Sequence, residues 1–324
     1  MTGGGHAVGA RIGYAHASAR VHRWVEQQLG GSVSTVIDCV GGMSPGPAAR
    51  VRTKRGASAF VKACGIGLNA NTPDLLRSEA RVLAALPPHP CLPRLLDVYD
   101  DGDWVALLVE DLVGASAPAP WRRDDLRRVS DAIREVRPVL DATALDGLPA
   151  AKDSSPIFLT RWRDLEARLD LLDPWWATHH DALARHAQRA ADLIGGDALV
   201  HWDMRADNVV LTPDRVVLVD WGQARRGAEW MDHAMLALDC SMSGSELSTS
   251  QLAHSDPSLR ARDPRDLLAL AAAAAMSFAS RSTEPAPQGL PTLPATSARW
   301  AHALRRYLTE TLTGAGPAPI PTDS

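Results

Sequence analysis

The sequence has few cysteines, no long apolar run and little net charge, and each absence excludes a class of protein. Its four cysteines, Cys39, Cys64, Cys91 and Cys240, are widely spaced and show neither a CxxC pair nor zinc-ligand spacing, so we expect free thiols in a reducing compartment. The most apolar segment, residues 267–279, is too short to span a bilayer. The first residues lack the apolar stretch of a signal peptide. We therefore expect a soluble, cytoplasmic protein.

Charge limits the kinds of partner. The formal net charge is −4 at pH 7 and the pI is near 6.3, with no run of basic residues. This is not the basic footprint of a nucleic-acid-binding protein or of a polybasic membrane anchor, so we expect no nucleic-acid and no membrane partner. A chain of 324 residues, 45% hydrophobic and 22% charged, can build one large domain or two modest ones.

The most informative stretch is residues 199–222, with the sequence LVHWDMRADNVVLTPDRVVLVDWG. Two apolar runs, residues 209–211 and 216–219, flank a Thr-Pro-Asp-Arg turn and predict a β-hairpin. A turn centred on its Asp would place Asn208 opposite Asp220 at the open end of the hairpin. An amide oxygen and a carboxylate at that distance can share Mg²⁺, which prefers oxygen ligands. Asp203 lies on the loop that enters the hairpin.

A glycine-rich turn lies near the start of the chain. Residues 32–40 and 49–52 are predicted strands, and the turn between them, residues 41–46, contains Gly42 and Ser44. A turn of this kind between two strands can place backbone N–H groups over phosphates. The turn taken alone is equally typical of an ordinary hairpin.

A buried ion pair is predicted between Lys62 and Glu79. Lys62 belongs to the strand expected over residues 58–62, where it either has a partner or reaches water from an edge strand. Glu79 falls in the middle of the apolar stripe of the helix expected over residues 72–86. A carboxylate that faces a core needs a cationic partner, and Lys62 lies one element earlier, so we favour the pair.

The remaining pattern indicates an α+β chain with two lobes. Residues 92–99 and 104–109 complete an antiparallel five-stranded sheet, and the chain from Asp124 onward is mainly helical. Helices are expected over residues 17–29, 72–86, 122–140, 158–171, 175–194, 228–238, 265–280 and 295–312. The predicted organisation is a disordered N-terminus (1–15), an N-terminal lobe (16–112), a C-terminal helical lobe (113–312) and a flexible tail (313–324).

The patterns His201-x-Asp203-x-x-x-x-Asn208 and Asp220-Trp221-Gly222 resemble the catalytic loop and the metal-binding triplet of the protein-kinase-like fold. The stretch is most similar to the aminoglycoside phosphotransferase family of small-molecule kinases. The resemblance implies a bilobal kinase-like fold that transfers the γ-phosphoryl group of ATP, or GTP, to a hydroxyl. It implies an aminoglycoside or other antibiotic as the first acceptor to consider, Asp203 as the base, and Asn208 and Asp220 as Mg²⁺ ligands.

The same resemblance implies a nucleotide site and supporting residues. The implied nucleotide-binding residues are Gly42, Ser44, Lys62, Glu79, Glu110, Asp111 and Val113, the last three at the hinge. His201 would support the loop through a hydrogen bond to the backbone. Arg205 would either neutralise the transferred phosphoryl group or be a solvated loop arginine. Asp232 would either brace the loop or be an exposed helical residue.

The acceptor is less well defined. Trp202 replaces a glycine that is often found there, and it either shapes the acceptor pocket or packs under the loop. Candidate lining residues, chosen only by region and each with a structural alternative, are Asp173, Trp175, Trp176, Glu229 and Trp230. No long activation segment comes after Gly222, which favours a small molecule over a protein as acceptor. A kinase of choline, homoserine or a sugar, and a non-catalytic nucleotide-binding regulatory module, are the alternatives.

Overall fold

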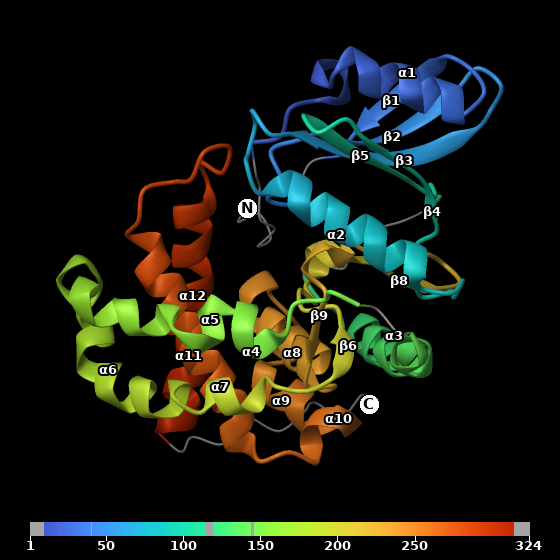
Figure 1. Cartoon of the computed structure of the whole chain (residues 1–324). Helices are drawn as coiled ribbons and strands as arrows, with labels where there is room; N and C mark the ends of the chain where they lie inside the picture. Colours follow the sequence, from blue (N-terminus) through green and yellow to red (C-terminus); the bar gives the residue numbers. More distant parts are fainter. Residues whose placement is uncertain (1–9, 40, 114–118, 144–145, 314–324) are drawn as a thin grey trace.

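The computed structural model of the protein describes residues 10–39, 41–113, 119–143 and 146–313. It has two lobes: a sheet with helices on its two faces at the N-terminal end, and a larger, mainly helical lobe (Figure 1). The predicted α+β, bilobal class is therefore confirmed. Within the described ranges, no helix is both long and apolar enough to cross a membrane, and all four cysteines are free thiols.

The N-terminal lobe is built on one antiparallel sheet in the order β1-β2-β3-β5-β4. Its strands are β1 (Val33–Asp38), β2 (Ala48–Thr53), β3 (Ser58–Gly65), β4 (Leu95–Asp100) and β5 (Trp104–Val109). The helix α1 (Ala19–Gln28) packs on one face with Val61 and Ala63, and α2 (Thr72–Ala85) packs on the other with Cys64. Because side chains alternate along β3, Lys62 shares the face that α2 covers.

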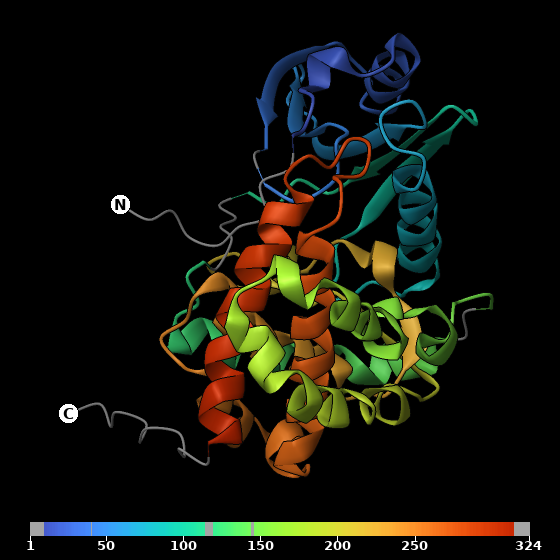
Figure 2. The same ribbon diagram turned by 90° about the vertical axis from the view of Figure 1, so that its left-hand side faces the viewer.

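The C-terminal lobe surrounds a buried central helix, α11 (Pro264–Ser282), whose alanine-rich run packs against α12 (Leu293–Leu312) (Figures 1 and 2). Its other α-helices are α3 (Arg123–Ala142), α4 (Ala151–Ser154), α5 (Pro156–Leu159), α6 (Pro174–Ala187), α7 (Ala190–Leu193), α8 (Met231–Ser243), α9 (Thr249–Ser255) and α10 (Pro257–Arg260). Two small antiparallel pairs complete it: β6 (Ala198–Val200) with β9 (Arg225–Gly227), and β7 (Val209–Leu211) with β8 (Val216–Leu218).

Several predicted helices differ in detail. The helix expected over residues 175–194 is two helices, α6 and α7, and that expected over residues 158–171 is largely the 3₁₀ helix η2 (Arg161–Leu171), packed against α11. Helices α9 and α10 were not predicted. Both begin at side-chain caps, a capping box of Ser248 with Gln251 and an Asp256 cap followed by Pro257, so capping residues are the signal that identifies them.

The register predicted for the hairpin is wrong by one residue. Val209 pairs with Leu218, and the Val219 N–H donates to the Asn208 carbonyl at 2.9 Å, so Asn208 lies opposite Val219. The turn closes through the Thr212 N–H and the Arg215 carbonyl at 2.9 Å, which puts its centre between the two middle residues rather than on the Asp. Asp220 comes one position later with a left-handed φ of 68°.

The N-terminal segment is ordered earlier than predicted. Residues 1–9 lie outside the described residues, as do 314–324 of the predicted tail. Within residues 10–15, however, the Arg11 guanidinium donates to the Gly41 and Gly46 carbonyls at 2.6 and 3.1 Å, and Tyr14 is buried against α1. The predicted disorder therefore does not extend to these residues, because they pack on the glycine-rich turn and the first lobe.

Candidate active site

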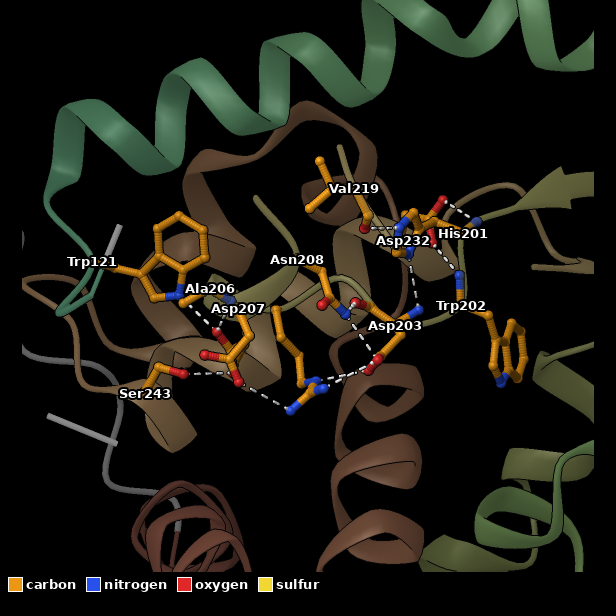
Figure 3. Close-up of polar contacts among 12 residues, drawn as sticks. Trp121, His201, Trp202, Asp203, Ala206, Asp207, Asn208, Val219, Asp232 and Ser243 are labelled. Carbon is orange, nitrogen blue, oxygen red and sulfur yellow. Dashed lines mark hydrogen bonds and ion pairs between the residues drawn. The ribbon is translucent and has the colours of Figure 1, made fainter. Parts of the chain in front are cut away.

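The loop of residues 201–208 connects β6 to β7 and carries Asp203 (Figure 3). Arg205 donates hydrogen bonds to both carboxylate oxygens of Asp203, with Nε 2.7 Å from Oδ1 and Nη2 3.1 Å from Oδ2. The Asn208 amide donates to Oδ2 and to the backbone carbonyl of Asp203, each at 2.8 Å. The Asp203 side chain is nevertheless 30% exposed. It is therefore oriented by two neighbours and open to a bound molecule.

Arg205 is not a solvated loop residue. Its guanidinium also lies 3.6 Å from the Asp207 carboxylate and over the Trp300 ring, 5.1 Å from the centroid. Burial would lower the pKa of Arg205, but Asp203 and Asp207 raise it above its ordinary value, so the guanidinium stays charged. Its shortest ion pair is with Asp203, so Arg205 is the counterion of that carboxylate.

Two buried carboxylates on α8 hold the loop from behind. Asp232 accepts the His201 N–H at 2.9 Å and the Trp202 N–H at 3.0 Å, so it is the brace rather than an exposed helical residue. Asp239 accepts the Ala206 N–H at 2.9 Å. Asp239 was not singled out from the sequence, although a carboxylate within an apolar helical segment was an available signal.

His201 supports the loop as expected. Its Nε2 lies 2.8 Å from the carbonyl of Val219, the residue directly after β8, and its ring meets Trp221 edge-on at 4.7 Å between centroids. Trp221 is fully buried and donates its Nε1–H to the Leu218 carbonyl at 2.8 Å. These contacts tie the 201–208 loop to the segment that carries Asp220.

Trp202 adopts the left-handed conformation, with φ 70°. This conformation is comfortable for glycine and costs other residues roughly 1–2 kcal/mol, which explains why a glycine suits this position. The ring of Trp202 is buried and meets Phe158 edge-on at 5.9 Å between centroids. The strained backbone is therefore offset by aromatic packing at the wall of a cavity.

The predicted pair between Lys62 and Glu79 is present. The Lys62 Nζ lies 2.9 and 3.0 Å from the two Glu79 oxygens and 3.3 Å from Oδ1 of Asp220. Burial would lower the pKa of Lys62, but Asp220 and Glu79 raise it above its ordinary value. Burial would raise the pKa of Asp220, but Lys62 and His201 hold it below its ordinary value. Lys62 therefore links α2 to the Asp220 segment as a charged group.

A cavity of about 170 Å³ lies between the lobes and brings together most of the predicted nucleotide residues. Its wall includes Gly42, Ser44, Lys62, Glu79, Asp203, Asn208 and Asp220. Gly42 has φ 74°, a left-handed backbone conformation that favours glycine, and a Cβ there would lie 2.5 Å from Nη2 of Arg11 and displace that side chain. Arg11, which was not predicted to belong to the site, also lines this cavity.

The predicted hinge residues do not line that cavity. Glu110 lies 3.2 Å from Arg215, Asp111 lies 2.6 Å from Arg50, and the Val113 residue is 74% exposed. The neighbouring residues 114–118 are outside the described residues. Adenine binding to the backbone near Asp111 and Val113 stays a prediction.

A second cavity, of about 310 Å³, adjoins the first. Met43, Asp203, Arg205 and Gln223 line both cavities, so Asp203 stands where they meet. The five residues predicted by region do not line it. Asp173 instead caps α6, Trp175 stacks on His179 at 4.3 Å between ring centroids, and Trp230 lies under Arg262.

The residues that do line the second cavity come from separate segments. They include Ser154, Phe158, Trp202, Arg225, Met235, Met242, Phe278, Arg281 and Trp300. Of these residues, Trp202 alone was singled out from the sequence, because it stands where a glycine is often found. Their convergence depends on how α5, α8, α11 and α12 pack, which local patterns do not reveal.

Comparisons with known proteins bear on the fold. No protein-family model and no curated protein sequence matches the chain. Among solved structures, a thermostable mutant of aminoglycoside phosphotransferase APH(4)-Ia in a ternary complex with ADP and hygromycin B is 16% identical, with a TM-score of 0.57 over 89% of this chain and 98% of that chain. Amicoumacin kinase hAmiN, in complex with AMP-PNP, Ca²⁺ and Ami, is 11% identical, with a TM-score of 0.56 over 95% and 97%.

A third similar structure is the aminoglycoside phosphotransferase from Alicyclobacillus acidocaldarius, which is 14% identical with a TM-score of 0.54 over 94% of this chain and 99% of that chain. At these identities the likeness concerns the fold. The resemblance predicted from the sequence is confirmed at that level: the chain has the protein-kinase-like fold shared by aminoglycoside phosphotransferases and related small-molecule kinases.

Proposed function

We propose that the protein transfers the γ-phosphoryl group of ATP, or of GTP, to a hydroxyl group of a small molecule, with Mg²⁺ as the metal ion. One observation carries the proposal: Asp203 stands where a cavity lined by Lys62 and Asp220 meets a second cavity of about 310 Å³. The first cavity would take the nucleotide phosphates and the second the acceptor. The similar structures include an aminoglycoside phosphotransferase in complex with hygromycin B and amicoumacin kinase in complex with Ami, which supports a small-molecule acceptor.

Asn208 and Asp220 are the residues that would hold Mg²⁺. The Asn208 amide nitrogen is used by Asp203, which leaves its oxygen as an acceptor, and the Asp220 side chain is 48% exposed. Within the described ranges no three His, Cys, Asp or Glu side chains group into a metal site of their own. An oxygen pair completed by nucleotide phosphates fits Mg²⁺, which would offset the negative charge of those phosphates.

The chain's own residues would position the reacting groups. The acceptor hydroxyl oxygen forms a bond to the γ-phosphorus while the bond from that phosphorus to the β–γ bridging oxygen breaks, and the nucleoside diphosphate leaves. The hydroxyl proton passes to the Asp203 carboxylate. Arg205 and Asn208 orient that carboxylate, and Lys62, held by Glu79, would contact the α- and β-phosphates.

The test is transfer from ATP or GTP with Mg²⁺ across hydroxylated compounds, read by mass spectrometry as a gain of one phosphoryl group. The panel includes hygromycin B, choline, homoserine and hexoses. We expect EDTA to abolish transfer and Asp203→Asn to slow it by at least about a hundredfold. Asp214→Asn makes the same chemical change at the exposed hairpin turn and should keep full activity. Full activity of Asp203→Asn would exclude Asp203 as the base.

A non-catalytic nucleotide-binding regulatory module is the second candidate. The observation that favours it is that both carboxylate oxygens of Asp203 already accept hydrogen bonds from Arg205, which competes with an acceptor hydroxyl. Calorimetry with Mg²⁺ and a non-hydrolysable ATP analogue separates the possibilities. Tight binding without transfer to any acceptor would favour the module, whereas absence of nucleotide binding would exclude both functions.

A further inference from the structure

The second cavity, which we call the acceptor cavity, has walls that are mainly apolar and aromatic. Phe158, Trp202, Met235, Met242, Phe278 and Trp300 all line it. Its volume of about 310 Å³ is at the lower end of the range for small-molecule sites. These walls suit a compact apolar body, since they offer a large apolar area.

The charges in the acceptor cavity are almost all positive. Three guanidinium groups line it, those of Arg205, Arg225 and Arg281, and the sole carboxylate among its described lining residues is Asp203. That carboxylate is already paired with Arg205. A bound molecule would therefore meet two further cations and no free anion.

Arg225 has no carboxylate partner within 4.0 Å among the described residues. Its Nη1 and Nη2 donate to neutral oxygens, Oγ of Ser154 and Oε1 of Gln223, each at 2.8 Å, and its Nε is buried without any hydrogen bond. Burial lowers the pKa of Arg225. A buried cation held only by neutral groups is costly unless something else compensates its charge.

Arg281, in the last turn of α11, is in a similar position. Its Nε donates to Oγ of Ser297 at 2.8 Å. The nearby Glu284 carboxylate is 3.0 Å from Arg161 and 3.6 Å from Arg168, so it is engaged elsewhere. Burial, and then Arg161, lower the pKa of Arg281 to about 10. A second cation at this cavity therefore lacks a carboxylate partner in the described part of the chain.

The aromatic faces are already covered by the protein's own cations. Arg205 lies 5.1 Å from the Trp300 ring centroid, and Arg281 lies 5.1 Å from that of Phe278. Arg225 lies 5.9 Å from the Trp202 ring. Aromatic rings can bind a cationic ligand, but here three of the four aromatic rings that line the cavity, all except that of Phe158, have a guanidinium beside them. A protonated amine would be repelled by these groups and would find no carboxylate to pair with.

From this arrangement we infer that the acceptor is an apolar hydroxy acid: a compact apolar body with a hydroxyl for Asp203 and one anionic group for Arg225 or Arg281. The inference rests on the proposed function for the role of Asp203, and it names the acceptor class. It replaces the polycationic aminoglycoside that the sequence resemblance implies, because several protonated amines would enter a positively charged cavity without partners.

Binding of matched acids and esters tests this inference on the full chain without nucleotide. The probes are mandelate, tropate and hydroxynaphthoate, each against its methyl ester, with hygromycin B as the polycation, and the readouts are calorimetry and quenching of tryptophan fluorescence. We expect at least one acid to bind at least about tenfold more tightly than its ester, as a charge-assisted contact requires. Hygromycin B should not bind.

Variants locate the effect. At least one of Arg225→Gln and Arg281→Gln should reduce the preference for acid over ester, whereas Arg306→Gln, at an exposed arginine on α12, should leave it unchanged. If no acid binds more tightly than its ester, or if hygromycin B binds or is phosphorylated, the inference is wrong. Phosphorylation of hygromycin B would contradict this inference but support the proposed phosphotransferase function. A preference for acids without any nucleotide binding would support the inferred specificity of the cavity but exclude the proposed function.

Discussion

Asp232 and Asp239 lie seven residues apart, two helical turns, on α8 and hold the two ends of the loop that carries Asp203. Asp232 accepts the N–H groups of His201 and Trp202, and Asp239 accepts that of Ala206. Asp239 also accepts the Trp121 Nε1–H at 2.8 Å. One helix thus fixes the Asp203 loop on both sides without touching either cavity through these carboxylates.

The first prediction concerns this brace. Asp239→Asn keeps the shape of the side chain but removes its charge and turns one of two acceptors into a donor, although Oδ2 accepts from Ala206 and Trp121 and Oδ1 accepts from Ser243. We expect kcat to fall by about ten- to a hundredfold because the loop shifts, with nucleotide affinity unchanged. Steady-state kinetics and nucleotide calorimetry measure the two quantities. Asp131→Asn on the exposed face of α3 is the matched control. An equal loss of nucleotide affinity would show that Asp239 does not act through the loop alone.

The second prediction concerns Lys62, which joins Glu79 and Asp220. Lys62→Met leaves Glu79 buried without a counterion, and we expect a loss of about 3–5 kcal/mol in the free energy of unfolding. The double variant Lys62→Met, Glu79→Met also removes the unpaired buried carboxylate and should recover part of that loss. Urea unfolding of Lys62→Met, of Glu79→Met and of the double variant measures these losses. Simple addition of the two single losses would mean that the pair is not coupled.

Lys62 and Glu79 also show why part of the site is predictable from sequence. Glu79 stands in an apolar helical stripe, and this local conflict identifies a buried partner one element away. The hairpin pattern is equally local, yet the predicted register was wrong by one residue. A four-residue turn can be centred on a residue or between two residues, and the sequence does not choose between these two registers. Local patterns thus identified the pair of Lys62 with Glu79 but not the register that sets Asn208 relative to Asp220.

The acceptor cavity illustrates what local patterns miss. Phe278 and Trp300 look like ordinary core residues of amphipathic helices, and they define a cavity only because α11 and α12 pack side by side. Arg281 and Arg225 look like surface cations until the fold buries them. The candidates chosen by region lay on α6 and near α8, because sequence proximity to the motifs was the sole guide.

The third prediction compares two substitutions at Trp202. Both Trp202→Ala and Trp202→Gly remove the ring and its contact with Phe158. At φ 70°, however, alanine keeps the conformational strain and glycine does not. We therefore expect the Gly variant to be more stable than the Ala variant by about 1 kcal/mol, measured by urea unfolding. At an ordinary helical position, such as Ala132 of α3, the order should be reversed, with glycine less stable.

The last prediction concerns Asp256, a buried carboxylate that accepts from Oγ of Ser130 at 2.6 Å and lies 2.9 Å from Nδ1 of His233. Burial would raise the pKa of Asp256, but His233 and Ser130 hold it below the ordinary value of 3.8. A carboxyl group with a lowered folded-state pKa stabilises the protein above its unfolded pKa and loses that contribution as the pH falls through the folded value.

The stability difference between the wild type and Asp256→Asn should therefore be largest near neutral pH, about 2–3 kcal/mol, and should shrink below a pH of about 3.8. Urea unfolding at a neutral and at two acidic pH values measures it. Asp131→Asn, which alters an exposed helical ion pair, should change stability by less than about 1 kcal/mol at every pH. A difference for Asp256→Asn that grew toward acid would mean that the folded protein holds this carboxyl group in its protonated form, because the sign of the dependence is set by which state binds the proton more tightly.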